Sequence, residues 1–231
     1  MGQARFRELF ADAGAEPSLD EVSLAIASAL RPGLDEAESL AALQQIADDC
    51  PRPDGSTVQP RPEAIAEYLF GDLGFAGNRD AYYDWRNSCL DRVIATRSGI
   101  PISLSILMIE VAQRLGVDLV GVGMPSHFLV GVVGEPNLFF DPFEGGRPLD
   151  RSDARRLFDA VTQGRIRWND AHLDPTPNRE IVIRMLNNLK VIFAERADRV
   201  RYAVVMQLRC SIPEIGLVEA DELPAATAVF N

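Results

Sequence analysis

The sequence is poor in the residues that most often carry metal or redox chemistry. It contains two histidines and three cysteines in 231 residues. The cysteines, Cys50, Cys89 and Cys210, are odd in number, lie far apart and form no C-x-x-C motif, which argues against a disulfide framework. Only His127 and His172 could supply imidazoles, so a zinc site is not expected. We predict no metal and no cofactor.

Long hydrophobic runs and an excess of positive charge are also lacking. The longest apolar run, residues 100–112, is too short and too interrupted to span a bilayer. No long apolar segment follows a basic start at the N-terminus, so we expect no signal peptide. The formal net charge is -11, and an acidic surface repels phosphate backbones and anionic lipids. We predict a cytoplasmic protein that binds neither nucleic acid nor membranes.

One arginine cluster has the opposite charge to the chain as a whole. It could form a local basic patch, or it could be the solvated charge of a helix and a loop. We favour the second interpretation, because isolated surface charges contribute little and usually face water. The cluster consists of Arg151, Arg155, Arg156, Arg165 and Arg167.

The composition is that of a globular protein, with 47% hydrophobic and 25% charged residues. Residues 1 to about 75 are predicted to be helical, because apolar residues recur at helical spacing. We expect helices at residues 19–30, 35–49 and 63–70. Residues 50–62 are predicted to form a loop, because they contain four prolines and a glycine.

The middle of the chain changes from a helical period to a strand period. Residues 103–115 carry a broad apolar stripe, which predicts a deeply buried central helix. Short β-branched and aromatic runs at 118–124, 127–133 and 137–141 predict an antiparallel meander, with a hairpin turn at 134–137. Further helices are expected at 87–95, 152–162 and 179–195. The expected fold class is therefore α+β.

Four residues around the central helix could carry chemistry. Cysteine-dependent acyl transfer needs a thiol at a helix N-terminus, an imidazole that takes its proton, and a carboxylate or amide that orients the imidazole. The chain offers a helix N-terminus at residues 101–105, which contains Ser103 and Ser105. His127 starts one predicted strand and Asp141 ends the next, so the turn brings them together. Whether the two share a face depends on the hairpin register.

Several motifs together resemble the SirB-type branch of the transglutaminase-like superfamily. The resemblance covers roughly residues 19–203. Its motifs are NSCL at 87–90, RSGIPISLS at 97–105, GVGMPSHFLV at 121–130, DPF at 141–143 and RMLNNLK at 184–190.

The resemblance implies a papain-like core, with a central buried helix, an antiparallel sheet and a Cys, His, Asp triad. His127 and Asp141 match the His and the Asp. The Cys position falls near residues 101–103, with Ser103 the best placement and Ser105 the second, and none of these residues is Cys. We expect an N-terminal helical extension at 1–75, a transglutaminase-like core at 76–200 and a short C-terminal helical tail at 201–231.

Each candidate residue also has a structural interpretation. Ser103 and Ser105 could be nucleophiles, but we favour an N-cap for Ser103 and a role in the first helical turn for Ser105. His127 could be a general base or a buried ring held by Asp141. Asp141 could orient His127 or start a turn. Cys89 could stand in for the missing thiol, but we favour a small buried residue.

Tyr82, Tyr83 and Trp85 precede the main motif. They could form an aromatic wall beside a ligand, although core or edge packing is the use that we favour.

Two functions remain open on the sequence. The first is a degenerate, non-catalytic binding or regulatory domain that holds a protein, peptide or small molecule in the former active-site cleft. The second is a hydrolase or acyltransferase that uses Ser103 or Ser105 with His127 and Asp141. We prefer the first, because the usual Cys nucleophile is missing.

Overall fold

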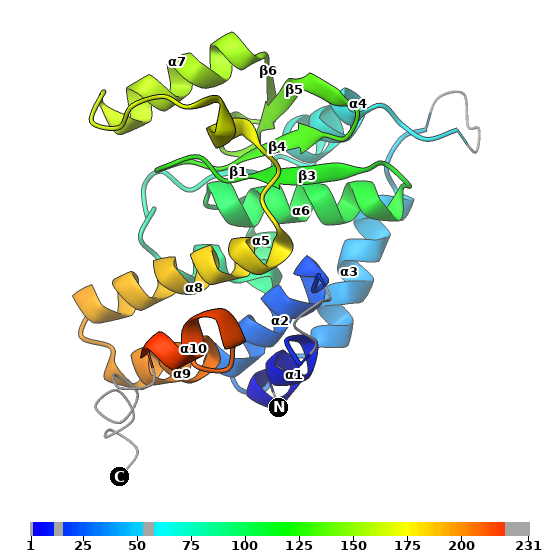
Figure 1. The fold of residues 1–231 in the computed structure, drawn as a ribbon. Helices are drawn as coiled ribbons and strands as arrows, with labels where there is room; N and C mark the ends of the chain where they lie inside the picture. Colours follow the sequence, from blue (N-terminus) through cyan, green and yellow to red (C-terminus); the bar gives the residue numbers. More distant parts are fainter. Residues whose placement is uncertain (1, 12–15, 53–57, 220–231) are drawn as a thin grey trace.

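A buried helix, α6, lies at the centre of the protein between a sheet and a layer of helices (Figure 1). The computed structural model describes residues 2–11, 16–52 and 58–219. Helix α6 spans Pro101–Arg114, and its residues from Pro101 to Ala112 are all buried. The sheet packs on one side of α6. Helices α2 (Leu19–Leu30) and α5 (Leu90–Thr96) pack on the other. The predicted deep burial of the central helix is confirmed.

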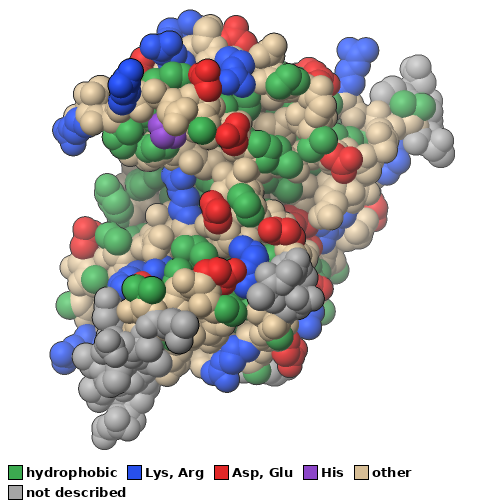
Figure 2. All heavy atoms as spheres, in the orientation of Figure 1, with side chains coloured by type: hydrophobic (Ala, Val, Ile, Leu, Met, Phe, Trp, Pro, Cys, Tyr) green, Lys and Arg blue, Asp and Glu red, His purple; other side chains and the backbone are tan. Residues whose placement is uncertain are grey.

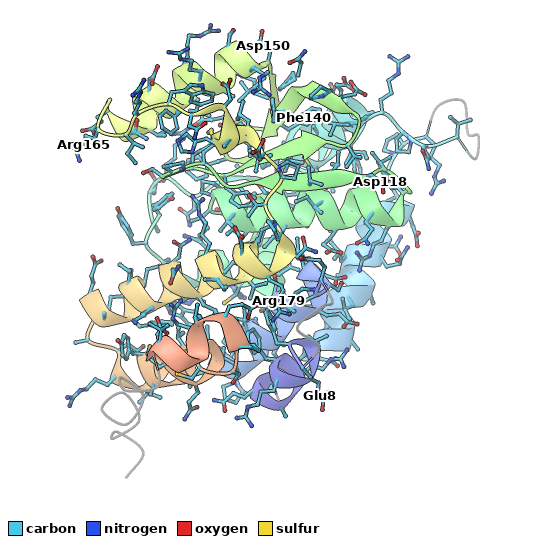
Figure 3. The ribbon with its side chains drawn as sticks, viewed as in Figure 1. Glu8, Asp118, Phe140, Asp150, Arg165 and Arg179 are labelled. Atoms are coloured by element: carbon cyan, nitrogen blue, oxygen red, sulfur yellow. The ribbon has the colours of Figure 1, made fainter. Side chains whose placement is uncertain are left out.

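The main sheet has four antiparallel strands in the order β3-β4-β5-β6. Val130 pairs with Phe140, and both belong to the apolar cluster shared with α6. Their neighbours Leu129 and Phe139 face a second cluster, beneath α7. This register decides which face of the sheet each hairpin residue occupies, a point that the sequence left open. Figure 3 shows Phe140 within the sheet. The strands are β3 (Leu119–Val122), β4 (Leu129–Val132), β5 (Glu135–Asp141) and β6 (Arg147–Leu149).

The remaining elements complete the two outer layers. Helix α7 covers the face of the sheet that α6 does not, and α8 lies below α6 in Figure 1. A short parallel pair, β1 (Ala76–Gly77) with β2 (Ser98–Gly99), precedes α6. The other helices are α1 (Gly2–Leu9), α3 (Glu36–Asp48), α4 (Pro62–Ala66), α7 (Arg151–Thr162), α8 (Asn178–Glu195), α9 (Arg199–Arg209) and α10 (Pro213–Glu219). Shorter turns are a π-helix, η2 (Glu67–Asp72), and the 3₁₀ turns η3 (Trp85–Ser88), η4 (Pro142–Glu144) and η5 (Asp170–Leu173).

The α+β class is confirmed, and the boundaries differ from the predictions in a few places. The predicted turn at 134–137 is wrong, because the chain turns at Val133 and Gly134, where Gly134 has φ +85°. Pro136 therefore lies inside β5, and the pairing shifts register between Gly131 and Val132. Glycine supplies the positive φ without steric cost, which fixes the turn there. The predicted helix at 87–95 is divided into η3 and α5.

The expected division of the chain at residue 75 stays a prediction. Leu24 of α2, Leu104 of α6 and Leu186 of α8 all belong to one apolar cluster. Part of the predicted loop, 53–57, and part of the predicted tail, 220–231, lie outside the described residues. Among the helices that are described, none is long and apolar enough to cross a bilayer.

Candidate functional site

His127 and Asp141 lie side by side where β4 begins and β5 ends. The imidazole Nε2 is 3.0 Å from the Asp141 Oδ2, and the two residues are only 7% and 1% exposed. The second carboxylate oxygen accepts the backbone N–H groups of Phe143 and Glu144, which begin η4. Asp141 therefore orients the imidazole and caps the next turn at once. Because Nε2 faces the carboxylate, Nδ1 is the ring nitrogen left for other partners.

The backbone around His127 is fixed from two sides. The His127 N–H donates to the Met124 carbonyl at 3.2 Å, and Ser126, between them, has φ +64°. The His127 carbonyl accepts a 2.7 Å hydrogen bond from Arg184 Nη2 on α8. A tight turn and a side chain from a distant helix together hold the ring beside Asp141.

Ser103 is part of the start of α6, in a different position from the predicted one. Ile100 is the N-cap residue, Pro101 occupies the first helical position and Ser103 the third, so the predicted N-cap role of Ser103 is wrong. Proline suits the first position because no N–H is needed there. The Ser103 Oγ accepts the Ile100 N–H at 3.1 Å and donates to the Asn87 carbonyl at 2.6 Å. This hydroxyl links α6 to η3.

Ser105 and Cys89 are both deeply buried. We expected Ser105 in the first turn of the central helix, but α6 begins at Pro101, so Ser105 follows that turn. Its Oγ has no hydrogen-bond partner among the described residues. The Cys89 thiol is 0% exposed, and burial raises its pKa to about 12. A thiol with such a pKa stays protonated at neutral pH and is a poor nucleophile.

A small pocket lies against His127. Its volume is about 120 Å³. The α6 residues that line it are Pro101 and Ile102; neither Ser103 nor Ser105 does so. The catalytic roles of Ser103, Ser105, His127 and Asp141 stay predictions. The full lining is Tyr82, Ile100, Pro101, Ile102, Ser126, His127, Phe128, Arg184 and Asn188.

Two pocket residues, Arg184 and Asn188, were not predicted as site residues. Both come from α8, about 60 residues after His127 in the chain. The RMLNNLK motif contains them, so the sequence carried a signal, but nothing in it placed α8 beside the pocket. Of the aromatic residues considered for a wall beside a ligand, Tyr82 lines the pocket, whereas Trp85 packs against Phe193.

The arginine cluster lies over and beside α7. Figure 2 shows Arg side chains gathered over this helix with Asp and Glu side chains among them. Arg156 pairs with Asp153, and Arg151 lies 3.8 Å from Asp170. Such pairs support the predicted solvated charge. In the described part of the chain, no group of three or more His, Cys, Asp or Glu residues could hold a metal ion.

Comparisons with known proteins give similarities along much of the chain. A UPF0162 protein of Xylella fastidiosa is 46% identical over 142 residues, which are 59% of this chain and 50% of that protein. A UPF0162 protein of Pseudomonas aeruginosa is 30% identical over 187 residues, covering 79% of this chain and 67% of the relative. The mouse F-box only protein 21 is 47% identical over 68 residues, which are 29% of this chain and 11% of that protein.

The chain spans about half the length of the first of these relatives. No solved structure matches it. The family profile of the transglutaminase-like superfamily matches residues 37–187, which include α6, the sheet, His127 and Asp141. The predicted resemblance is thereby confirmed: this chain belongs to the transglutaminase-like superfamily, in the branch of its UPF0162 relatives.

Proposed function

We propose that this transglutaminase-like domain is non-catalytic and that the pocket beside His127 binds a ligand. One observation carries the proposal: Ile102, on the first turn of α6, lines the pocket together with His127. Acyl transfer needs a thiol or hydroxyl next to the imidazole. An aliphatic side chain has no lone pair with which to attack a carbonyl.

The nearby hydroxyls and thiol support this proposal. The Ser103 Oγ is bonded to backbone groups of Ile100 and Asn87, and a serine needs a base aligned with its hydroxyl before it can react. Ser105 and Cys89 are 0% exposed. None of the three lines the pocket.

A second candidate function is a serine-dependent hydrolase or acyltransferase. The observation that favours it is the buried His127–Asp141 pair, in which Nε2 faces the carboxylate and Nδ1 could act as the base. Ser103 would have to leave its bonds to Asn87 and Ile100 to reach that nitrogen. We prefer the binding function because this rearrangement would break the hydrogen bonds that hold the start of α6 to η3.

The ligand could be a segment of a protein, a peptide or a small molecule. We also propose that the protein is located in the cytoplasm. The predictions that the protein binds neither nucleic acid nor membranes, and needs no cofactor, belong to the same proposal.

Active-site labelling tests the two functions against each other. The protein would be treated with a fluorophosphonate and, separately, with iodoacetamide, and adducts would be mapped by peptide mass spectrometry. His127→Ala and denatured wild-type protein are the controls. We expect no serine adduct and slow cysteine labelling in the native state. A stoichiometric adduct on Ser103 or Ser105 that disappears in His127→Ala would establish the serine enzyme instead.

A further inference from the structure

Arg184 brings a positive charge into the pocket, and no carboxylate of the described residues pairs with it. Within the described residues it forms no ion pair, and its one hydrogen bond runs from Nη2 to the His127 carbonyl. Its guanidinium carbon lies 5.4 Å from the centre of the Phe128 ring. A guanidinium has five N–H donors, so several remain for a ligand.

Three other buried or half-buried arginines form ion pairs with carboxylates of the protein. Arg179, labelled in Figure 3 at the start of α8, forms an ion pair with a carboxylate of α10. Burying a cation without a partner is costly unless water or a ligand compensates for the lost hydration. Arg184 therefore differs from these arginines in having its charge available. The pairs are Arg114 with Asp20 and Glu110, Arg179 with Glu214, and Arg209 with Glu219.

The rest of the pocket suits a negatively charged group. No Asp or Glu lines it, whereas Tyr82, Ser126 and Asn188 can each donate a hydrogen bond. The first turn of α6, at Pro101 and Ile102, forms another wall, and a helix N-terminus carries partial positive charge. Hydrogen-bond donors around a single guanidinium suit a singly charged anion.

The size of the pocket limits what enters it. Its volume is about 120 Å³. Pockets that enclose a whole ligand of drug size are about 300–1,000 Å³. A carboxylate group fits, whereas most of a drug-sized ligand would lie outside.

We infer that the pocket binds the carboxylate at the end of a longer ligand, with Arg184 as its counter-ion. The planar guanidinium can hold both carboxylate oxygens at once. Phosphate would bring a second negative charge, and no second Lys or Arg lines this pocket. The inference rests on the proposed binding function, since it names the ligand class of the same pocket.

NMR titration of the whole chain tests the inference. The probes are acetate, an N-acetylated dialanine with a free carboxylate, the same peptide as its amide, and inorganic phosphate, all at constant ionic strength. The signals followed are the Arg184 Nε–H and the His127 ring. We expect saturable shifts with acetate and the free-acid peptide, none with the amide, and weaker binding of phosphate.

Variants locate the effect at Arg184. Arg184→Gln should weaken acetate binding, followed at the His127 ring, by about tenfold or more. Arg184→Lys keeps the charge but loses the paired N–H donors of the planar guanidinium, so its affinity for acetate should be intermediate. Arg155→Gln removes the same charge from an exposed position on α7 and should bind like the wild type.

Three results would overturn the inference: equal shifts from the acid and the amide, tighter binding of phosphate than of acetate, or an affinity that survives Arg184→Gln. The wild-type titration decides the first two even if a variant does not fold. If one of these results is found and labelling gives no serine adduct, only the carboxylate as ligand class is rejected, and the proposed binding function stands. A serine adduct removes the proposed function, whatever the titration shows.

Discussion

Two serine hydroxyls in α6 have opposite surroundings although they lie two residues apart. Ser103 accepts a hydrogen bond from Ile100 N–H and donates one to Asn87 O. Ser105 is equally buried, but its hydroxyl has no partner among the described residues. A satisfied buried hydroxyl stabilises a fold, whereas an unsatisfied one costs its desolvation energy.

Alanine substitutions should therefore separate the two serines. Ser103→Ala leaves the Ile100 N–H and the Asn87 carbonyl unpaired, so we expect a loss of about 1–2 kcal/mol in the free energy of unfolding. Ser105→Ala removes an unpaired hydroxyl and should change stability by less than about 0.5 kcal/mol or increase it. Urea denaturation of both variants measures the difference. Equal losses at the two positions would contradict the assigned hydrogen bonds.

His127 and Asp141 form a buried pair whose role can be read from stability. If the pair is structural, His127→Ala should lower the free energy of unfolding by about 1–3 kcal/mol, because Asp141 loses a buried partner. If the pair is catalytic, stability should stay nearly unchanged and activity should disappear. For the binding function we expect the structural outcome.

A double-mutant cycle with Asp141→Asn isolates the contact between the two side chains. The coupling energy should be about 0.5–3 kcal/mol, the range of residues in direct contact. A coupling near zero, with neither binding nor activity altered in His127→Ala, would exclude both roles.

At the scale of elements, Glu110 joins α6 to the start of α2. Its Oε1 accepts the backbone N–H groups of Leu19 and Asp20 at 3.1 and 3.3 Å, and its Oε2 lies 3.0 Å from Arg114. Burial, and next the nearby Asp20 carboxylate, raise the pKa of Glu110 to about 7, against the influence of Arg114. This contact predicts a pH dependence that surface carboxylates do not show.

Stability should fall as the pH rises from about 4.5 to about 7. In that range the unfolded chain has lost the Glu110 proton, at its ordinary pKa of 4.5, while the folded protein keeps it. The folded state then binds more protons, so the free energy of unfolding decreases with pH. The full shift corresponds to a change on the order of 3 kcal/mol.

Glu110→Gln is the matched control, because the amide keeps an acceptor oxygen and has no proton to lose. The wild type should lose stability relative to this variant between pH 4.5 and 7 in urea denaturation. The pKa of Asp20 is lowered from 3.8, so that group titrates below the range. Parallel curves for the two proteins would show that folding does not raise the pKa of Glu110.

At the scale of the whole molecule, helices from both ends of the described chain share one core. The apolar cluster around α6 includes Leu24 of α2, Leu186 of α8 and Val205 of α9. A second cluster between the sheet and α7 contains Phe139 and Phe158. Removal of α2, which packs directly on α6, would expose the apolar side of α6.

A chain that lacks residues 1–75 should therefore fail to fold by itself. Buried leucines cost about 2–5 kcal/mol each when their packing is lost, and natural domains are stable by only about 5–15 kcal/mol. We expect no cooperative thermal transition for residues 76–231, and recovery of the transition when a separate 1–75 fragment is added. A single cooperative transition without the fragment would establish an independent core with an N-terminal extension.

The elements were largely predictable because their signals are local. Helical spacing of apolar residues predicted α2, and β-branched runs predicted β3 and β4. The start of α6 was misplaced, because a proline at the first helical position resembles a break before the helix. Strand β6 was missed, because Arg147 and Pro148 are poor strand residues, paired here with Asp141 and Phe140.

The sequence by itself determined the α+β class, the superfamily and the absence of a Cys near residues 101–103. These depend on local period and on residue identity, which the chain carries directly. Only the tertiary structure decided the hairpin register, the position of Ile102 in the pocket wall and the contact of Arg184 on α8 with His127. Side-chain direction alternates with each strand residue, and distant helices meet only through packing, so no local pattern could fix them.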